Sequence, residues 1–291
     1  MSKKITTPYT KYVSKVAKLV TDGRSIPLGG FPSLPKPALA PDAPKALFFA
    51  PHPDDETIAG GLLLRLLQEA KWDVTNVSVT LGRIPERKAG RLAELKNACN
   101  FLGFNLAQLD PNGLNGVTTA SRTKEPAAWA EMVKLAVKVL QEYRPRVVFM
   151  PHEFDWNGTH IGVHHLVMDA LAGVPDLNCY VVETEFWGQM QTPNLLVEYS
   201  TEVAAELVAA ISFHVGEVQR NPYHLLLPAW MQDNVRRGSE LVGGQGGAAA
   251  QFMFAQVYRL RRWNGHQIED CQSGGRFLPM GTNPADLFPA K

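Results

Sequence analysis

Hydrophobic residues in the middle of the chain come in short unbroken runs that alternate with longer amphipathic stretches. The short runs are typical of strands buried on both faces of a parallel sheet, and they predict strands over residues 46–50, 74–81, 146–150 and 179–185. Apolar positions three and four residues apart predict helices over residues 58–69, 86–102, 127–142 and 159–172. This alternation predicts an α/β fold, a three-layer α/β/α sandwich with a Rossmann-like, mostly parallel sheet. Functional residues should therefore follow the ends of strands, after Ala50, Leu81 and Met150.

The two ends of the chain are less regular. Residues 8–22 have the apolar spacing of an amphipathic helix, and residues 27–44 hold six prolines, which exclude regular structure. We therefore divide the chain into an N-terminal helix and Pro-rich arm, residues 1–44, and an α/β domain, residues 45–291. In the last third we expect a helix over 202–218, loops over 221–228 and 243–247, and a strand over 252–260.

Composition narrows the class of protein. The 291 residues include 29 Lys and Arg against 28 Asp and Glu, and this near-zero net charge argues against a nucleic-acid or membrane-surface partner. Cys99, Cys179 and Cys271 lie far apart without a CxxC pair, which fits a reducing compartment. No apolar run reaches the roughly 18 residues of a membrane span, and residues 5–15 lack the apolar core of a signal peptide. We expect a cytoplasmic protein.

A dense cluster of titratable residues follows the first predicted strand. His52, Asp54, Asp55 and Glu56 lie directly after residues 46–50, with a proline on each side of the histidine. Such charges next to an apolar layer need compensation, and a divalent metal supplies it, because His and Asp are common zinc ligands. One aspartate could bind the metal while its neighbour acts as a base. The alternative is that the acids only complement the start of the next helix, but this leaves the histidine unexplained.

A second cluster follows the third strand end, after Met150. Four of the eight histidines lie within fifteen residues there, namely His152, His160, His164 and His165. A catalytic zinc site needs a third protein ligand, and this cluster can provide one. His160 and His164 are one helical turn apart and share a helix face, so the spacing alone leaves both open.

The first cluster also resembles a known signature. Residues 50–56, Ala-Pro-His-Pro-Asp-Asp-Glu, are similar to the motif of the PIG-L/LmbE-like zinc-dependent N-deacetylases, which act mostly on amino-sugar substrates related to N-acetylglucosamine. The similarity extends through Thr80-Leu81-Gly82 and through Arg91 and Glu94, on a helix that ends in Leu102-Gly103. It covers about residues 45–225.

The resemblance implies roles for individual residues. His52 and Asp55 would bind the metal, Asp54 would be the general base, and His160 would be the third ligand. The second motif of the family is typically His-Pro-Asp-His, and here it reads Asn157-Gly158-Thr159-His160. An asparagine can donate a hydrogen bond to an oxyanion but cannot deliver a proton. His152 or His164 could take over that proton transfer, and His164 is also the rival of His160 for the metal.

Several other residues are weaker candidates. Asp110 matches a position that contacts the sugar in the family, although an aspartate before Pro111 equally starts a turn. Arg83 and Arg87 could reach a substrate hydroxyl or phosphate, but we favour a solvated loop. Other positions could border the site, although ordinary helix or core packing explains them equally well or better; they are His214, Trp187, Tyr223 and Trp230.

The sequence thus predicts a zinc-dependent amidohydrolase that removes an acyl group, in the first place acetyl, from an amino sugar or glycoconjugate. Iron or cobalt would suit similar ligands. Two alternatives are an amidase for another small N-acyl substrate, such as a thiol conjugate or antibiotic-type intermediate, and a non-catalytic metal-containing amino-sugar-binding protein. The N-terminal arm could cover the site or bridge the subunits of a homo-oligomer, and nothing in its sequence decides between these.

Overall fold

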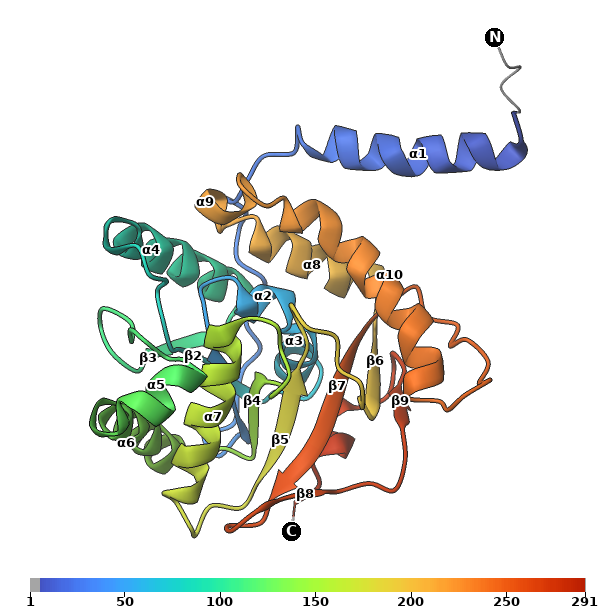
Figure 1. Cartoon of the computed structure of the whole chain (residues 1–291). Helices are drawn as coiled ribbons and strands as arrows, with labels where there is room; N and C mark the ends of the chain where they lie inside the picture. Colours follow the sequence, from blue (N-terminus) through green and yellow to red (C-terminus); the bar gives the residue numbers. More distant parts are fainter. Residues whose placement is uncertain (1–5, 291) are drawn as a thin grey trace.

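The computed structural model describes residues 6–290 and has helices on both faces of one sheet (Figure 1). Within the described residues the sheet has nine strands, in the order β3-β2-β1-β4-β5-β7-β6-β9, with β8 paired to β7. Strands β3 to β5 in this order are parallel, whereas β7 runs antiparallel to β5, β6 and β8. The strands are β1 (Lys45–Ala50), β2 (Asp73–Ser78), β3 (Asn105–Gln108), β4 (Val147–Pro151), β5 (Cys179–Thr184), β6 (Leu195–Tyr199), β7 (Phe254–Trp263), β8 (Ile268–Asp270) and β9 (Arg276–Leu278).

Two groups of helices cover the two faces of the sheet. Helices α6 and α7 pack on one face, and α3, α4, α8 and α10 pack on the other. The helices are α1 (Pro8–Gly23), α2 (Asp55–Ile58), α3 (Gly61–Gln68), α4 (Pro85–Leu102), α5 (Thr119–Lys124), α6 (Pro126–Tyr143), α7 (Gly158–Ala172), α8 (Thr201–Ile211), α9 (Val215–Val218), α10 (Tyr223–Leu241) and the 3₁₀ helix η1 (Pro284–Leu287). The predicted three-layer α/β architecture is confirmed.

The central strands are buried on both sides, and their side chains alternate between the two faces as the pleat requires. In β1, Phe48 belongs to the core beneath α3 and α8, whereas Leu47 and Phe49 belong to the core beneath α6 and α7. The side chains of β4 alternate in the same way, with Phe149 in the first core and Val148 in the second. Continuous apolar sequence in these strands is therefore the result of burial on two faces.

The order of the strands places a crevice between β1 and β4. From β1 the chain moves outward through β2 to β3, and it then returns to place β4 on the other side of β1. The two strands are parallel neighbours with Ala46 opposite Val147 and Phe48 opposite Phe149. Loops leaving such neighbours diverge, which makes this edge the usual binding position in an open α/β sheet. The His-Asp cluster after β1 and the histidines after β4 meet there.

The structure corrects some predicted boundaries. The helix expected over 58–69 begins only at Gly61, as α3, because Ile58 ends the separate short helix α2. Gly60 lies in the connection, where a Cβ atom would lie 2.0 Å from the Glu56 carbonyl oxygen. The helix expected over 202–218 is interrupted between α8 and α9. The loop expected over 221–228 is wrong, because α10 begins at Tyr223 and includes Pro228 near its start. The proline there removes only one hydrogen bond, to the His224 carbonyl, which the buried face of the helix outweighs.

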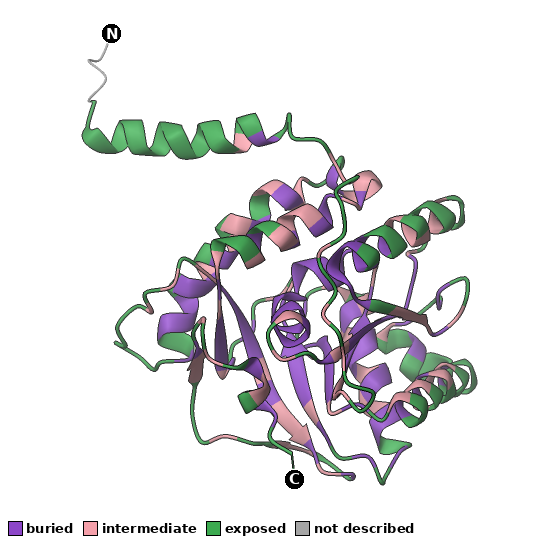
Figure 2. Cartoon of the chain, turned by 180° about the vertical axis from the view of Figure 1, so that it is seen from behind, coloured by how far each residue is buried: buried purple, intermediate pink, exposed green. Residues whose placement is uncertain are grey.

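The N-terminal arm consists of a projecting helix and an extended segment. Helix α1 projects away from the body, and most of its residues are exposed (Figure 2). The extended segment after it follows the body closely, where the Gly29 N–H donates to Ser212 Oγ and the Leu34 N–H donates to the Phe101 carbonyl. Residues 1–5 of the arm lie outside the described residues. No helix within residues 6–290 has the length and apolar character to cross a bilayer.

Candidate metal centre and active-site cavity

Three side chains from one loop and two helices converge at the β1–β4 crevice. His52 lies in the loop after β1, Asp55 begins α2, and His160 lies in the first turn of α7. His52 Nδ1 and His160 Nε2 are 3.2 Å apart. Asp55 Oδ2 lies 3.6 Å from the first atom and 3.5 Å from the second. Asp55 and His160 are buried, and His52 is partly exposed.

This triangle of atoms has the size that a tetrahedral metal requires. Bonds of about 2.0–2.1 Å place neighbouring ligand atoms roughly 3.3–3.4 Å apart, close to the three distances observed. Two imidazole nitrogens and one carboxylate oxygen are also a common donor set of catalytic zinc, with one coordination position left for water or substrate. The three residues therefore fit a divalent transition metal in both geometry and chemistry.

A buried carboxylate stands behind His160. Asp155 Oδ2 lies 3.7 Å from His160 Nδ1, on the side of the ring away from the candidate metal atoms. Asp155 is fixed by two backbone N–H groups, those of Asn157 at 2.8 Å and Trp187 at 3.2 Å. A carboxylate behind a metal-ligating histidine orients the ring and makes it more basic. The sequence analysis did not select Asp155, although it lies in the His-rich segment.

Asp54 has a backbone conformation that is unusual for any residue except glycine. Its φ angle is 127°, and such a conformation costs about 1–3 kcal/mol. Local contacts hold it there: its N–H donates to Glu56 Oε2 at 2.9 Å, and its carbonyl accepts from the Thr57 hydroxyl at 2.7 Å. The turn therefore presents Asp54 and Asp55 in different directions, as a base and a ligand at one site require.

A second buried pair supports this turn from the C-terminal part of the chain. Glu56 is fully buried, and its Oε1 lies 2.6 Å from His214 Nε2. His214 immediately precedes α9, so the pair joins α2 to the α8–α9 connection. The acidic side chains after β1 therefore do more than complement a helix start. Glu56 holds the Asp54 backbone with one oxygen and His214 with the other.

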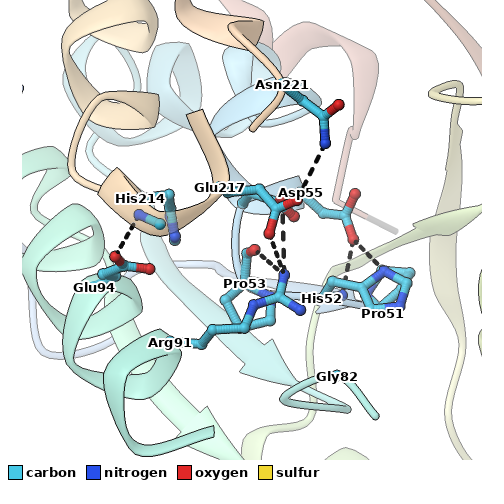
Figure 3. Close-up of polar contacts among 12 residues, drawn as sticks. Pro51, His52, Pro53, Asp55, Gly82, Arg91, Glu94, His214, Glu217 and Asn221 are labelled. Carbon is cyan, nitrogen blue, oxygen red and sulfur yellow. Dashed lines mark hydrogen bonds and ion pairs between the residues drawn. The ribbon is translucent and has the colours of Figure 1, made fainter. Parts of the chain in front are cut away.

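Arg91 borders the site from α4 (Figure 3). Its Nη2 atom donates to the Pro53 carbonyl at 2.9 Å and lies 3.7 Å from Glu217 Oε2 and 3.9 Å from Asp54 Oδ2. Its guanidinium also packs against Gly82, where a Cβ atom would lie 2.5 Å from Nη1. Gly82 has a φ of 83°, and this left-handed backbone conformation is the reason that glycine is favoured there.

The environment shifts the pKa values of these groups in opposite directions. Burial, and then the charge of Asp55, raise the pKa of Asp54 well above its usual value, with Arg91 opposing. Burial alone would also raise the pKa of Asp55, but His160 and His52 outweigh it and lower that pKa. Neighbouring carboxyls with separated pKa values are typical of a pair in which one group exchanges protons and the other stays ionised.

A polar cavity of about 800 Å³ opens beside the cluster. His52 and Asn157 line it together with Arg83, Arg87 and Arg91. The Asn157 side-chain oxygen caps α7 by accepting the Thr159 N–H at 2.9 Å, which leaves its NH₂ group available to a ligand. Arg83 and Arg87 thus lie on the wall of a cavity, whereas the sequence favoured a loop without contact to a site.

The remaining predicted site residues lie elsewhere. His164 is buried, with Nδ1 3.0 Å from the Pro151 carbonyl and 3.5 Å from Glu183 Oε1. His152 is also buried, with Nε2 2.8 Å from the Gly188 carbonyl. The Asp110 side chain accepts the Asn112 N–H at 2.8 Å and forms a turn. None of the three lines the polar cavity as the structure describes it, so the geometry favours His160 over His164 beside His52 and Asp55.

Comparison with known families agrees with this geometry. Residues 47–171 match the family described as PIG-L, GlcNAc-PI de-N-acetylase, and the match includes all the residues of the His-Asp-His cluster. This part of the chain is a PIG-L family domain. The match ends before α8, α9 and α10, so His214 and Glu217, which contact the site from this later part of the chain, lie outside it.

Two curated relatives of the PIG-L domain have the name 1D-myo-inositol 2-acetamido-2-deoxy-alpha-D-glucopyranoside deacetylase. The protein from Segniliparus rotundus is 31% identical over 162 residues, which are 45% of this chain and 51% of that protein. The protein from Mycolicibacterium smegmatis is 29% identical over 175 residues, which are 50% of this chain and 59% of that protein. The aligned part therefore spans little more than half the length of either relative.

Solved structures share the fold at lower identity. The N,N'-diacetylchitobiose deacetylase of Pyrococcus horikoshii is 16% identical with a TM-score of 0.55, over 91% of this chain and 96% of its own. The conserved protein TT1542 of Thermus thermophilus is 21% identical with a TM-score of 0.55, over 74% of this chain and 93% of its own. GalB, a 4-carboxy-2-hydroxymuconate hydratase, also matches, with 17% identity and a TM-score of 0.56, over 75% of this chain and 95% of its own. The fold alone therefore does not specify deacetylation, and the residues of the site must carry that argument.

Proposed function

We propose that the protein is a zinc-dependent N-deacylase that releases an acyl group from the nitrogen of an amino sugar or glycoconjugate. The observation that carries the proposal is the compact His52, Asp55 and His160 triangle with the buried carboxyl of Asp54 beside it. The deacetylase names of the relatives support the reaction class. The three free cysteines fit a reducing compartment, so a cytoplasmic location is part of this proposal.

In the proposed mechanism His52, Asp55 and His160 hold the metal. When bound, the ion lowers the pKa of a coordinated water toward 7 and polarises the amide carbonyl. Asp54 accepts a proton from the attacking water, and its raised pKa suits a group that must bind and release protons. The NH₂ group of Asn157 donates a hydrogen bond to the developing oxyanion. Asp54 then returns its proton to the departing amine.

The polar cavity supports a hydroxyl-rich substrate. Thr80, Asn115 and Thr118 line it beside the three arginines, and this density of donors and acceptors suits a sugar ring. With about 800 Å³ the cavity can hold a sugar together with part of an attached group. We therefore propose a 2-acylamino sugar as the substrate, and an N-acetylglucosamine derivative as the first compound to assay.

The test measures amine release from N-acetylglucosamine and its 1-O-alkyl and 1-phosphate derivatives. The protein is assayed after metal removal and again after addition of zinc, iron(II) or cobalt. We expect release only with a metal, and the metal that restores the highest rate at equal occupancy identifies the preferred ion. A zinc-loaded protein that binds these sugars but releases no amine would overturn the hydrolase proposal in favour of a binding protein.

A further inference from the structure

An apolar pocket of about 210 Å³ lies next to the metal centre and is lined by side chains that the proposed mechanism does not use. These side chains are without charge and come from α2, from the segment after β5 and from α10. They are Ile58, Phe186, Trp187, Tyr223, Leu226, Leu227 and Trp230. Trp187 and Leu226 are 42% and 48% exposed. Large apolar side chains at the surface beside a reaction centre indicate a binding site.

The apolar pocket adjoins the metal centre through Phe186. The Phe186 ring lies 5.8 Å from the His160 ring, centre to centre, and 5.9 Å and 6.2 Å from the rings of Tyr223 and Trp230. Ile58 ends the same short helix that begins with Asp55. The pKa of Tyr223 is raised by burial and then by the charges of Asp54, Glu217 and Asp55.

The polar cavity and the apolar pocket border different ligands of the metal centre. His52 lines the polar cavity, and His160 packs against Phe186 of the apolar pocket. An amide at this centre has two substituents, the sugar on its nitrogen and the R group on its carbonyl carbon. A sugar in the polar cavity directs the R group toward Phe186, where a single methyl group would leave most of the space unfilled.

We infer that the apolar pocket binds the acyl chain of the substrate, and that this chain is longer than acetyl. A group of about the size of one water molecule takes up about 30 Å³. If each carbon of the chain needs about that space, the volume of 210 Å³ suits an unbranched chain of about six carbons. The inference rests on the proposed deacylase function and refines it, because it assigns the substrate class as N-acyl amino sugars with a medium-length chain. The bond cleaved is the same amide bond, and water supplies the hydroxyl group of the released fatty acid.

The experiment compares kcat/KM of the zinc-loaded protein for N-acetyl-, N-butanoyl-, N-hexanoyl- and N-decanoylglucosamine. We expect kcat/KM to rise roughly fourfold for each buried methylene up to about hexanoyl and then to level off. Trp230→Ala removes part of the pocket wall, and Leu226→Trp fills the pocket with a larger side chain. In both variants the ratio of kcat/KM for hexanoyl over acetyl should fall at least tenfold. The control is Leu241→Ala, because Leu241 is an exposed leucine at the far end of α10 and should leave the ratio unchanged. A kcat/KM that is equal for all four substrates, or highest for acetyl, would overturn the inference and leave the deacylase proposal intact.

A binding measurement separates this inference from the reaction itself. In zinc-loaded Asp54→Asn, intrinsic tryptophan fluorescence reports on Trp187 and Trp230 in the pocket wall. N-hexanoylglucosamine should bind at least tenfold more tightly than N-acetylglucosamine, and the difference should disappear in the Asp54→Asn, Leu226→Trp double variant. Tighter binding without turnover of any amide by the wild-type protein would refute the hydrolase and retain the acyl pocket. Equal affinities would refute the pocket.

Discussion

His52 Nδ1 and His160 Nε2 lie 3.2 Å apart although 108 residues separate them in the chain. The pairing of β1 with β4 brings them together, because each histidine follows the carboxyl end of one of these strands. Two neutral imidazoles at this distance can share one hydrogen bond, and two protonated ones would repel each other. The arrangement is therefore suited to a cation between them, with Asp55 as the third donor.

Replacement of His160 should remove the metal. His160→Ala eliminates one of three ligands, so we expect metal content to fall from about one ion per chain to a small fraction after dialysis, measured by atomic emission. His165→Ala is the matched control on the same helix, because His165 is outside the cluster. A His160→Ala protein with a full metal complement would refute the ligand assignment, and a loss of metal in His164→Ala alone would transfer that role to the buried neighbour.

Asp54→Asn should separate metal binding from turnover. The side chain keeps its size but loses its basicity, so kcat should fall by ~10²–10⁴ while metal content stays near that of the wild type. Steady-state kinetics on any accepted amide and metal analysis of the same preparation provide the two measurements. Wild-type kcat in this variant would contradict the proposed proton transfer. Loss of the metal would mean that Asp54 and Asp55 have exchanged roles.

Asp155→Asn tests whether the carboxylate behind His160 tunes the metal centre. Removal of a charge that orients a ligand typically weakens metal affinity by about 10–100-fold. We expect that loss in a competition titration with a chelator, together with a fully folded circular dichroism spectrum. Asp176→Asn is the control, because Asp176 is exposed and pairs with Arg144 away from the site. An unchanged metal affinity in Asp155→Asn would mean that Asp155 only holds the loop conformation and does not affect the metal centre.

Arg65 should be a large contributor to stability. It is fully buried, forms an ion pair with Glu69, and donates to the backbone carbonyls of Glu198, Leu278, Pro279 and Thr282. Arg65→Met leaves these carbonyls without their donor, so we expect the free energy of unfolding to fall by about 3–5 kcal/mol in urea denaturation. The exposed Arg144→Met should cost about 0–1 kcal/mol. A loss of less than about 1 kcal/mol in Arg65→Met, the range of an exposed pair, would show that water replaces the guanidinium.

Acid sensitivity should depend in part on His164. Burial lowers its pKa to about 4, and the groups around it are His152, His165, Arg261 and Glu183. Because the unfolded chain binds the proton with a pKa near 6.5, the free energy of unfolding falls as the pH drops from about 6.5 toward 4.

His164→Asn removes this titration and can still donate to the Pro151 carbonyl, because the Asn amide nitrogen takes the place of Nδ1. Between about pH 7 and pH 4.5 its free energy of unfolding should fall by about 2–3 kcal/mol less than that of the wild type. Urea titrations at both pH values provide the comparison. An identical loss in the two proteins would mean that His164 accepts a proton in the folded state near its ordinary pKa.

The sequence was most informative about the fold and the site in the part of the chain where strands and helices alternate regularly. Strands with an apolar run, such as residues 46–50 of β1 and β4, are recognisable because burial on two faces excludes polar side chains. His52 and Asp55 could be selected because ligand-type residues follow a strand end directly, whereas His160 could be chosen over His164 only through the resemblance to the family motif. The match of residues 47–171 to a known family covers this same part of the chain.

Residues that act through distant contacts could not be found in this way. Glu217 and Phe186 carry no local signal, since their importance arises from Arg91 and His160, which are remote in sequence. The role of Asp155 was equally hidden, because an aspartate in a loop usually forms a turn. The early part of α10 was missed because Pro228 suggested a loop, whereas packing of Leu227 and Met231 against the core maintains the helix.

The position of β7 has a consequence for synthesis on the ribosome. All the candidate catalytic residues and the strands β1 to β5 are complete once Thr184 has been made. Strand β6 has to wait, because its partners in the sheet are β7 and β9, which come later in the chain. At about 5–20 residues per second the roughly 80 residues from Thr184 to Trp263 take about 4–16 s. During that interval the three residues proposed to bind the metal have all been made, whereas Tyr223 and Trp230 have no sheet on which to dock. The residues proposed to hold the metal are thus synthesised before the apolar wall that would enclose a substrate.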